Sequence, residues 1–191
     1  MKNDIILSGV GGQGILSIAS AIGLAALGNN LFLKQAEVHG MSQRGGDVYS
    51  HFRLSDKPVK SDLIPHGKAD LIISMEPMES LRYLPWLSQQ GWLVTNSNPF
   101  VNISDYPPVE DILKEIRKIK NNVIIDADAI AKESGSARSG NIVVLGAASR
   151  FIEVPYKSLE NAIRQLFLRK GEEIVEINLI ALKAGRDFSV R

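Results

Sequence analysis

Residues 4–14 read DIILSGVGGQG, and this stretch decides the fold. Residues 4–8 form an apolar run of strand length, and the loop that follows holds four glycines within residues 9–14. The next segment, residues 15–22, has apolar residues at helical spacing. The sequence therefore begins with a strand, a glycine turn and a helix. Glycines in such a turn permit positive φ angles and a close approach of the backbone to a bound group, and the helix start favours an anion.

The spacing of these glycines raises the hypothesis of a dinucleotide site. Gly9, Gly11 and Gly14 fit the pattern G-x-G-x-x-G, and Glu37 lies near the end of the next expected strand, where a ribose-binding acid belongs. Against this hypothesis, the turn itself reads GGQG, and a long polar loop follows Glu37 in place of a short connection to a helix. A nicotinamide or flavin site and a purely structural turn both stay open. Gln13 offers its amide either to a ligand or to the turn as a cap.

The composition fits one α/β domain. The chain has 191 residues, of which 45% are hydrophobic, so a single domain spanning residues 1–191 is expected. The formal net charge of +1 gives no field strong enough to attract nucleic acid or an anionic membrane. The absence of cysteine excludes disulfides, thiolate nucleophiles, iron–sulfur clusters held by the chain and the usual zinc sites. With no signal peptide and no long apolar run, a cytoplasmic chain is expected.

Further apolar runs predict an α/β fold of Rossmann-like type, with a mostly parallel open sheet and helices on both faces. Residues 31–37 predict a second strand, so the opening reads as a βαβ unit with a right-handed crossover. Residues 47–54 alternate between apolar and polar side chains, which predicts an exposed or edge strand. Small residues at 146–148 permit close helix packing. Buried strands are predicted at residues 69–75, 91–96 and 122–127, and further helices from Pro77 onward and at residues 109–119, 141–151, 158–169 and 173–186.

A second candidate site is the polar, glycine-rich segment VHGMSQRGG, residues 38–46. It follows a predicted strand directly, and open α/β sheets bind ligands at the carboxyl ends of their strands. Arg44 stands between Ser42-Gln43 and two glycines, which let its guanidinium approach a carboxylate or phosphate closely. An arginine that only ties down its own loop is the alternative.

The chain lacks an evident catalytic set. No serine sits in a nucleophile elbow, and no lysine follows the glycine turn as it does in a P-loop. His39, His51 and His66 have no spacing typical of metal ligands, so no metal is predicted. An acid–base role for His39 and His51 stays open beside the more common role of a plain hydrogen-bonding residue. Asp126 and Asp128 flank the end of a strand and are interpreted as loop caps. A binding loop without catalytic residues indicates a subunit whose chemistry lies on a partner.

Several motifs in register resemble one family. They are the turn at residues 9–14, residues 37–46 with Val48 and residues 51–53, and the residues Asp70-Leu71, Glu76-Pro77 and Glu79. In this combination the chain resembles, over essentially its whole length, the gamma-type subunit or domain of the 2-oxoacid:ferredoxin oxidoreductases. The form HGMSQRGG at residues 39–46 is most similar to the branch that holds the beta subunits of the indolepyruvate:ferredoxin oxidoreductases.

The resemblance implies a role in the oxidative decarboxylation of indolepyruvate or another aryl 2-oxoacid to acyl-CoA. Coenzyme A is then the acyl acceptor, and ferredoxin accepts the electrons. Thiamine diphosphate and the iron–sulfur clusters are expected on a large partner subunit, so this chain alone is expected to hold no cofactor and to be inactive. The lack of cysteine agrees with that division.

The resemblance also implies that the two loops face the shared active-site region, where they contact coenzyme A, the substrate or the partner. The residues carried over are Gly11, Gly12, Gln13, Gly14, Glu37, Met41, Ser42, Gln43, Arg44, Gly45 and Gly46. Two other functions stay open beside this one: a freestanding NAD- or FAD-dependent oxidoreductase of Rossmann type, and a non-enzymatic ligand-binding or scaffold protein.

Overall fold

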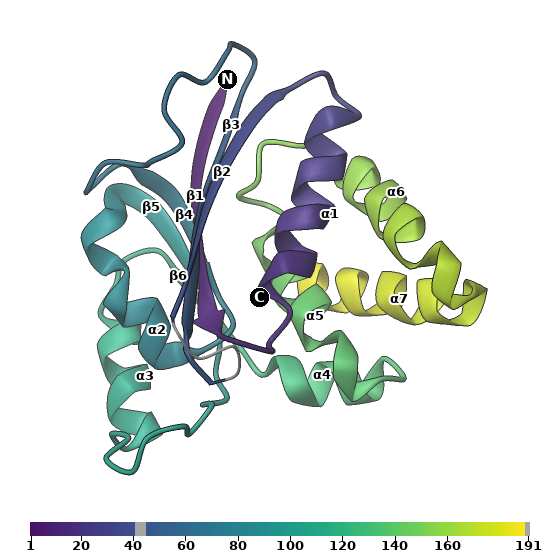
Figure 1. Ribbon diagram of the computed structural model, residues 1–191. Coiled ribbons are helices and arrows are strands. Elements are labelled where there is room, and N and C mark those ends of the chain that lie inside the picture. The colour runs from purple at the N-terminus through teal and green to yellow at the C-terminus, as the bar shows by residue number, and fades with distance from the viewer. Residues whose placement is uncertain (41–44, 190–191) are drawn as a thin grey trace.

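A six-stranded sheet lies at the centre of the computed structural model, which describes residues 1–40 and 45–189 (Figure 1). The strand order is β2-β3-β1-β4-β5-β6. The strands are β1 (Lys2–Val10), β2 (Phe32–His39), β3 (Asp47–Ser55), β4 (Ala69–Ser74), β5 (Leu87–Asn96) and β6 (Asn122–Ile125). The α-helices are α1 (Ile15–Leu27), α2 (Pro77–Arg82), α3 (Val109–Arg117), α4 (Ala127–Glu133), α5 (Gly140–Ala148), α6 (Tyr156–Phe167) and α7 (Glu172–Phe188). Short 3₁₀ turns are η1 (Leu84–Trp86), η2 (Ala137–Ser139) and η3 (Leu168–Lys170).

Most strands of the sheet run in one direction. β1, β4, β5 and β6 pair in parallel, and β3 runs antiparallel to both of its neighbours, β1 and β2. The prediction of an α/β fold with a mostly parallel sheet is therefore confirmed. The opening βαβ unit is present only in part, because β2 runs in the direction of β1 but β3 is inserted between them.

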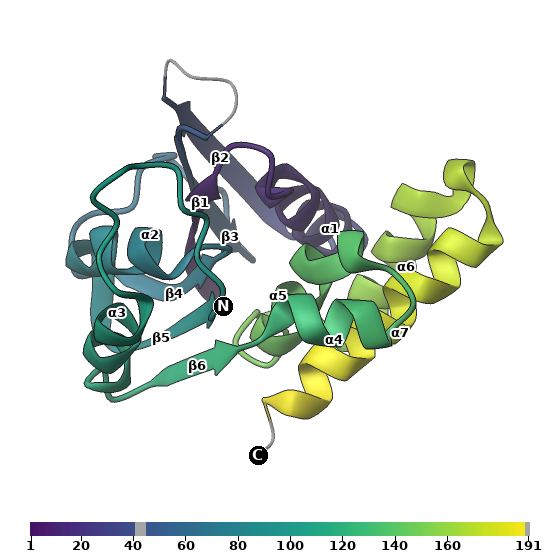
Figure 2. The same cartoon turned by 90° about the horizontal axis from the view of Figure 1, so that it is seen from below.

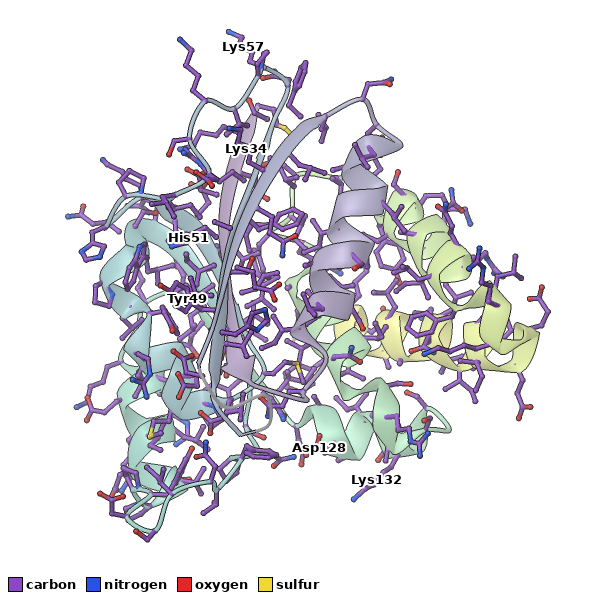
Figure 3. All side chains as sticks on the ribbon, in the orientation of Figure 1. Lys34, Tyr49, His51, Lys57, Asp128 and Lys132 are labelled. Carbon is purple, nitrogen blue, oxygen red and sulfur yellow. The ribbon has the colours of Figure 1, made fainter. Side chains whose placement is uncertain are left out.

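The prediction of an edge strand at residues 47–54 is wrong, since β3 has a paired strand on each side. One face of β3 packs Phe52 into the core against α1. The more polar face is also covered: Tyr49 packs on the side of α2 (Figure 3), and Arg53 forms an ion pair with buried Asp4 at 2.8 Å. Polar side chains that bind buried partners produce the same alternating pattern as side chains in solvent.

The edges of the sheet are β2 and β6. Residues 122–127 were predicted as a buried strand, but β6 ends at Ile125, and residues 122–124 are only partly buried. Ala127 begins α4, a helix that the sequence pattern did not predict. An apolar run indicates that the faces of a strand are covered, but it does not indicate whether a further strand pairs with its outer edge.

Helices cover both faces of the sheet (Figure 1, Figure 2). α1, α4, α5, α6 and α7 lie on one face, and α2 and α3 cover the other. The predicted apolar stripe of α1 is confirmed, because Ile15, Ile18, Ala19, Ile22 and Ala26 are all buried. No helix in the described ranges is long and apolar enough to cross a lipid bilayer.

The backbones of α5 and α7 touch each other. A Cβ atom added at Gly146 would lie 2.1 Å from the Leu182 carbonyl oxygen, and one added at Gly185 would lie 2.0 Å from the Val143 carbonyl oxygen. Only glycine fits at both positions. The prediction that small residues in this helix permit close packing is confirmed.

Candidate functional site

The two predicted loops meet at the carboxyl edge of the sheet. Two backbone hydrogen bonds join them: Gly11 N–H donates to the Gly46 carbonyl at 2.8 Å, and Gly45 N–H donates to the Gly11 carbonyl at 3.4 Å. Asn102, from the loop before α3, donates its side-chain amide to the Gly45 carbonyl. The described ends of the two loops therefore form one hydrogen-bonded unit. The remaining predicted residues of the second loop, Met41, Ser42, Gln43 and Arg44, lie outside the described residues.

Gln13 caps the glycine turn. Its Oε1 accepts the Val10 N–H at 2.8 Å, and its Nε2 donates to the Met75 carbonyl at 3.3 Å, at the end of β4. Of the two roles that the sequence left open for Gln13, the structure shows the capping role. Gly14 has a φ of 81° before α1, and its carbonyl accepts the Asn141 side-chain amide at 3.2 Å. The turn is thus attached both to β4 and to α5.

Glu37 lies on the edge strand β2 and not on a direct neighbour of β1. Its carboxylate pairs with His39 Nε2 at 2.5 Å and accepts a hydrogen bond from Gln35 Nε2 at 3.2 Å. In the dinucleotide-binding fold the acidic residue follows a strand that lies next to the first one. Here β3 separates the two strands, so the geometry around Glu37 does not match the dinucleotide hypothesis.

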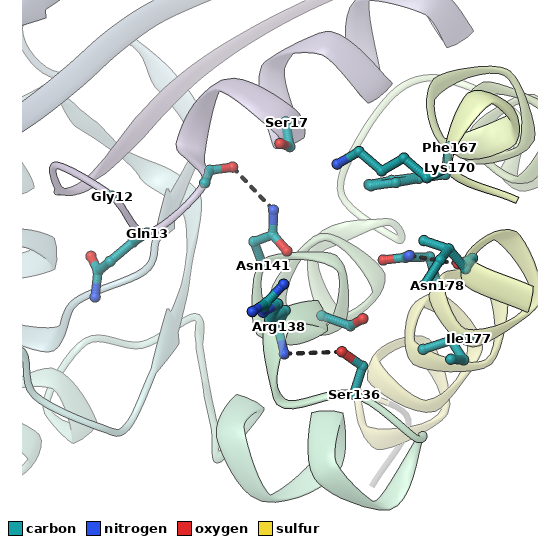
Figure 4. A pocket seen from close by; sticks show the side chains of 13 residues that line it. Gly12, Gln13, Ser17, Ser136, Arg138, Asn141, Phe167, Lys170, Ile177 and Asn178 are labelled. Atoms are coloured by element: carbon teal, nitrogen blue, oxygen red, sulfur yellow. Dashed lines mark hydrogen bonds between the residues drawn. The ribbon is translucent and has the colours of Figure 1, made fainter.

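A cleft of about 310 Å³ opens between the N-terminus of α1 and the C-terminal helices (Figure 4). One wall is formed by the glycine turn with Ser17, and the others by η2 with the start of α5 and by η3 with α7. Arg138 of η2 and Lys170 of η3 are its charged residues, and we refer to it as the basic cleft. The sequence-based interpretation missed both cations, because neither belongs to a motif and they lie on separate short helical turns.

Two further clefts adjoin the glycine turn. An apolar groove of about 290 Å³ lies between the turn and the strand ends, where it is lined by Leu16, His39 and Val48. A larger cleft of about 470 Å³ lies between the turn and the segment after β5, near Phe100. Gly12 lines all three clefts, so the turn is the point at which they meet.

Buried Glu79 lies beside half-buried Asp47 at the start of β3. The Tyr83 hydroxyl donates to Asp47 Oδ2 at 2.6 Å, whereas Asp47 Oδ1 is buried and receives no hydrogen bond from the described residues. Glu79 lies beside Asp47, and burial raises the pKa of Glu79 to about 7; the Arg82 guanidinium opposes this shift, and the Asp47 charge adds to it. Burial and the nearby Asp47 charge therefore both favour a proton on Glu79 in the folded state.

Glu76 connects α2 to the loop that precedes α3. Its Oε2 caps α2 by accepting the Glu79 N–H at 2.8 Å. Its Oε1 accepts the Phe100 N–H at 3.3 Å and the Tyr106 hydroxyl. Burial and the hydrogen bond to Glu76 raise the pKa of Tyr106. The Glu-Pro motif therefore holds the loop whose Asn102 contacts Gly45.

His51 and Asp126 have the structural roles that the sequence predicted. His51 Nδ1 accepts the Ile64 N–H at 3.2 Å, and burial lowers the pKa of His51. Asp126 caps α4 by accepting the Ala129 N–H at 2.9 Å. Within residues 1–40 and 45–189, no three histidine, aspartate or glutamate side chains are grouped as a metal site would require.

The sequence matches the family described as "Pyruvate ferredoxin/flavodoxin oxidoreductase" over residues 4–188. A relative from Archaeoglobus fulgidus, indolepyruvate oxidoreductase subunit IorB, is 38% identical over 100% of this chain and 96% of its own length. The chain belongs to the pyruvate ferredoxin/flavodoxin oxidoreductase family.

Solved structures share the fold of this member of the pyruvate ferredoxin/flavodoxin oxidoreductase family. The pyruvate oxidoreductase subunit PORC from Thermotoga maritima matches with a TM-score of 0.75 at 23% identity, over 97% of this chain and 96% of that one. The 2-oxoglutarate:ferredoxin oxidoreductase from Magnetococcus marinus with 2-oxoglutarate, coenzyme A and succinyl-CoA bound matches with a TM-score of 0.77 at 21% identity. That match covers 99% of this chain but 31% of the longer chain. The fold therefore occurs both as most of a separate chain and as one part of a longer chain.

The candidate residues of this pyruvate ferredoxin/flavodoxin oxidoreductase family member fall into two groups. The structure brings the turn at residues 11–14 together with Gly45 and Gly46. It leaves Glu37 on an edge strand, paired with His39. The turn, and not Glu37, therefore lies where the three clefts meet.

Proposed function

We propose that this chain is a subunit of a thiamine-dependent 2-oxoacid:ferredoxin oxidoreductase complex that converts indolepyruvate, or another aryl 2-oxoacid, to its acyl-CoA. The observation that carries the proposal is the full-length similarity to the indolepyruvate oxidoreductase subunit of Archaeoglobus fulgidus. The family match over residues 4–188 agrees with the class of the complex.

Thiamine diphosphate and the iron–sulfur clusters are assigned in this proposal to a large partner subunit. Iron–sulfur clusters are bound chiefly through cysteine thiolates, and this chain contains no cysteine. Coenzyme A then acts as a co-substrate of the complex, and the electrons leave through the partner to ferredoxin. The complex is proposed to be cytoplasmic, in keeping with a chain free of cysteine.

The carboxyl edge of the sheet is the surface that we assign to the partner's active-site region. Its described part contains the turn at residues 11–14 with Gly45 and Gly46, and Glu37 lies on the neighbouring edge strand β2. Large apolar side chains are exposed on the same edge, namely Leu16, Val38, Phe100, Val101 and Ile103. Apolar side chains that are exposed together are typical of a surface that a partner covers. Residues 1–191 act in this proposal as one domain, because a single sheet carries both loops.

The test is to co-express this chain with the large subunit and to measure ferredoxin reduction in the presence of indolepyruvate and coenzyme A. We expect activity from the assembled complex and none from this chain alone. Bound flavin, or saturable NAD binding by this chain alone, would instead support a freestanding oxidoreductase. Metabolite binding that needs no partner and leads to no turnover would support a binding protein.

Arg44 tests the second loop within the assembled complex. If its guanidinium binds a coenzyme A phosphate or the substrate carboxylate, Arg44→Ala should raise KM for one of them about tenfold or more with assembly unchanged. Arg117→Ala is the matched control, because Arg117 is an exposed arginine of α3 that pairs with Glu110 at 2.6 Å. Unchanged kinetics with weaker assembly would make Arg44 an interface residue.

A further inference from the structure

The outer side of β2 presents unpaired backbone groups. β2 is an edge strand of eight residues (Figure 2), and among the described residues no strand pairs with its outer side. Gly40 N–H donates to the Asp47 carbonyl at 2.8 Å, in the register of the pairing between β2 and β3. Since bonded residues alternate along an antiparallel strand, the even-numbered residues of β2 bond to β3. The N–H and C=O groups that point outward are those of Leu33, Gln35, Glu37 and His39.

Few features of β2 protect this edge from another strand. Natural edge strands are commonly blocked by a proline, a bulge or a lysine. β2 contains no proline, and its register with β3 is unbroken from Phe32 to His39. Its one lysine, Lys34, donates to the Lys60 carbonyl of its own chain at 3.1 Å. The other edge strand, β6, has only four residues, so β2 is the edge better suited to a further pairing.

Two large apolar side chains are exposed along the same edge. Phe32 is 48% exposed and Val38 is 44% exposed. They are six residues apart, so both lie on one face of the strand, the face on which Tyr49 of β3 packs toward α2. A single exposed apolar side chain is common on a protein surface. Two of them near the two ends of an unpaired edge strand would both be covered by one added strand.

The sequence of β2 is complementary to itself in one antiparallel register. Side chains directly opposite each other in such a pair lie on the same face, so a two-fold axis between two copies must pass through a residue of β2. An axis at Lys34 or Glu37 would place like charges directly opposite each other, which is unfavourable. An axis at Gln35 avoids this and places Phe32 opposite Val38 of the second copy.

We propose that β2 pairs with β2 of a second copy of this chain, antiparallel and about a two-fold axis at Gln35. The outward groups of Leu33, Gln35 and Glu37 then form about six backbone hydrogen bonds, and the two sheets become one. Phe32 and Val38 cover each other once on each side of the axis. The interface is small, so the free chain should dimerise with a Kd between about 1 μM and about 1 mM.

This surface is distinct from most of the carboxyl edge assigned above to the large subunit. Val38 belongs to both surfaces, and in the proposed pairing the second copy covers it. Leu16, Phe100, Val101 and Ile103 stay available to the large subunit. The pairing uses atoms of this chain alone, so it does not depend on the proposed function.

The experiment is disulfide trapping in the full chain, alone and in the assembled complex. The chain contains no cysteine, so one introduced cysteine reports one contact. In the proposed register the two Gln35 residues are a hydrogen-bonded pair with Cα atoms about 5.5 Å apart, which a disulfide can bridge. Gln35→Cys, oxidised with glutathione disulfide, should form a linked dimer about tenfold or more faster than Gln165→Cys, the control on the exposed face of α6. Non-reducing gel electrophoresis measures both rates.

A second set of variants tests the apolar pair. Phe32→Glu and Val38→Lys should each weaken dimerisation about tenfold in sedimentation velocity, because each removes one side of the pair. The double variant places opposite charges across the axis and should regain at least about threefold over either single variant. Leu168→Lys is the control, since Leu168 is 56% exposed in η3, away from β2. Unchanged melting temperatures establish that the variants fold.

Each outcome decides for or against the proposed pairing. Rapid linking of Gln35→Cys both in the free chain and in the assembled complex supports it. The proposal is overturned if Gln35→Cys is linked no faster than Gln165→Cys, or if Ala36→Cys is linked faster, since that result would place the axis at Ala36. It is also overturned if assembly abolishes the link, because the large subunit would then occupy the edge of β2.

Discussion

Gln13 shows how one side chain determines the shape of the glycine turn. Both of its polar atoms bond to backbone groups, the Val10 N–H and the Met75 carbonyl, so the amide is occupied within the chain. The pattern of glycines alone suggested a phosphate held at this turn by bare backbone. The structure instead closes the turn with the Gln13 side chain, and the charged residues of the adjoining cleft, Arg138 and Lys170, come from two other walls.

Replacing Gln13 therefore tests the cap. Gln13→Ala should lower the free energy of unfolding by about 1–3 kcal/mol, because the N–H of buried Val10 loses its acceptor. Gln13→Glu keeps an acceptor oxygen and should cost less. The measurement is chemical denaturation, with Gln165→Ala on the exposed face of α6 as a control that should stay within about 0.5 kcal/mol of wild type. A wild-type midpoint for Gln13→Ala would contradict the capping role.

At the scale of helices and strands, the contact between α5 and α7 depends on glycine. Gly146→Ala would place a methyl group 2.1 Å from the Leu182 carbonyl oxygen, so the helices must separate, and we expect a loss of about 3 kcal/mol in unfolding free energy. Gly23→Ala in α1 is the matched helical control. Its nearest neighbour would be the Phe52 ring at 3.7 Å, so the better helix propensity should add up to about 1 kcal/mol. Thermal unfolding of both variants measures the difference, and equal shifts would exclude the proposed backbone contact.

The raised pKa of Glu79, which lies on α2, makes stability depend on pH. The folded state raises the pKa of Glu79 from 4.5 to about 7, so it binds this proton more tightly than the unfolded chain does. The resulting stabilisation is complete below the unfolded value and is lost as the pH rises through about 7. The unfolding free energy should therefore decrease between about pH 5 and about pH 8, and this decrease should be larger for wild type than for Glu79→Gln.

The control for this pH dependence is Glu110→Gln, which removes an exposed carboxylate of α3 that pairs with Arg117. It should keep the wild-type slope of stability against pH. Identical slopes for wild type and Glu79→Gln would show that Glu79 does not hold the proton.

The helices and strands were largely predictable from the sequence, but the order of the strands in the sheet was not. Continuous apolar runs predicted β4 and β5, and helical spacing predicted α1, α3 and the three C-terminal helices. The position of β3 between β2 and β1 follows from pairing across distant segments, which no local pattern contains. Arg53 illustrates the difficulty. It pairs with buried Asp4, but the sequence pattern of the strand would be the same if Arg53 were exposed to solvent.

At the scale of the whole molecule, the apolar side chains at the carboxyl edge indicate where a partner binds. Val101→Asp introduces a charge on this edge and should reduce co-purification with the large subunit about tenfold or more, since a charge would be buried at the interface. Leu27→Asp is the control. Leu27 ends α1, away from the carboxyl edge, and its side chain is 60% exposed against 67% for Val101. Equal assembly of both variants would remove the carboxyl edge as the docking surface.

The candidate site was predictable only where motifs marked it. The glycine turn and the loop that ends at Gly46 were predicted, and backbone hydrogen bonds join them. Arg138 and Lys170 were missed, because only the fold brings η2 and η3 next to the N-terminus of α1. A single basic residue on a short helical turn has no local signal that distinguishes it from an ordinary surface charge.

The glycine contact between α5 and α7 also limits which molecules the basic cleft can admit. α5 holds one wall through the bond from Asn141 to Gly14, and it holds the opposite wall through Gly146 and Gly185 against α7. The separation of the walls is therefore a backbone dimension that side-chain rotation cannot widen. Any group that enters the basic cleft therefore meets walls whose spacing is limited by Gly146 and Gly185.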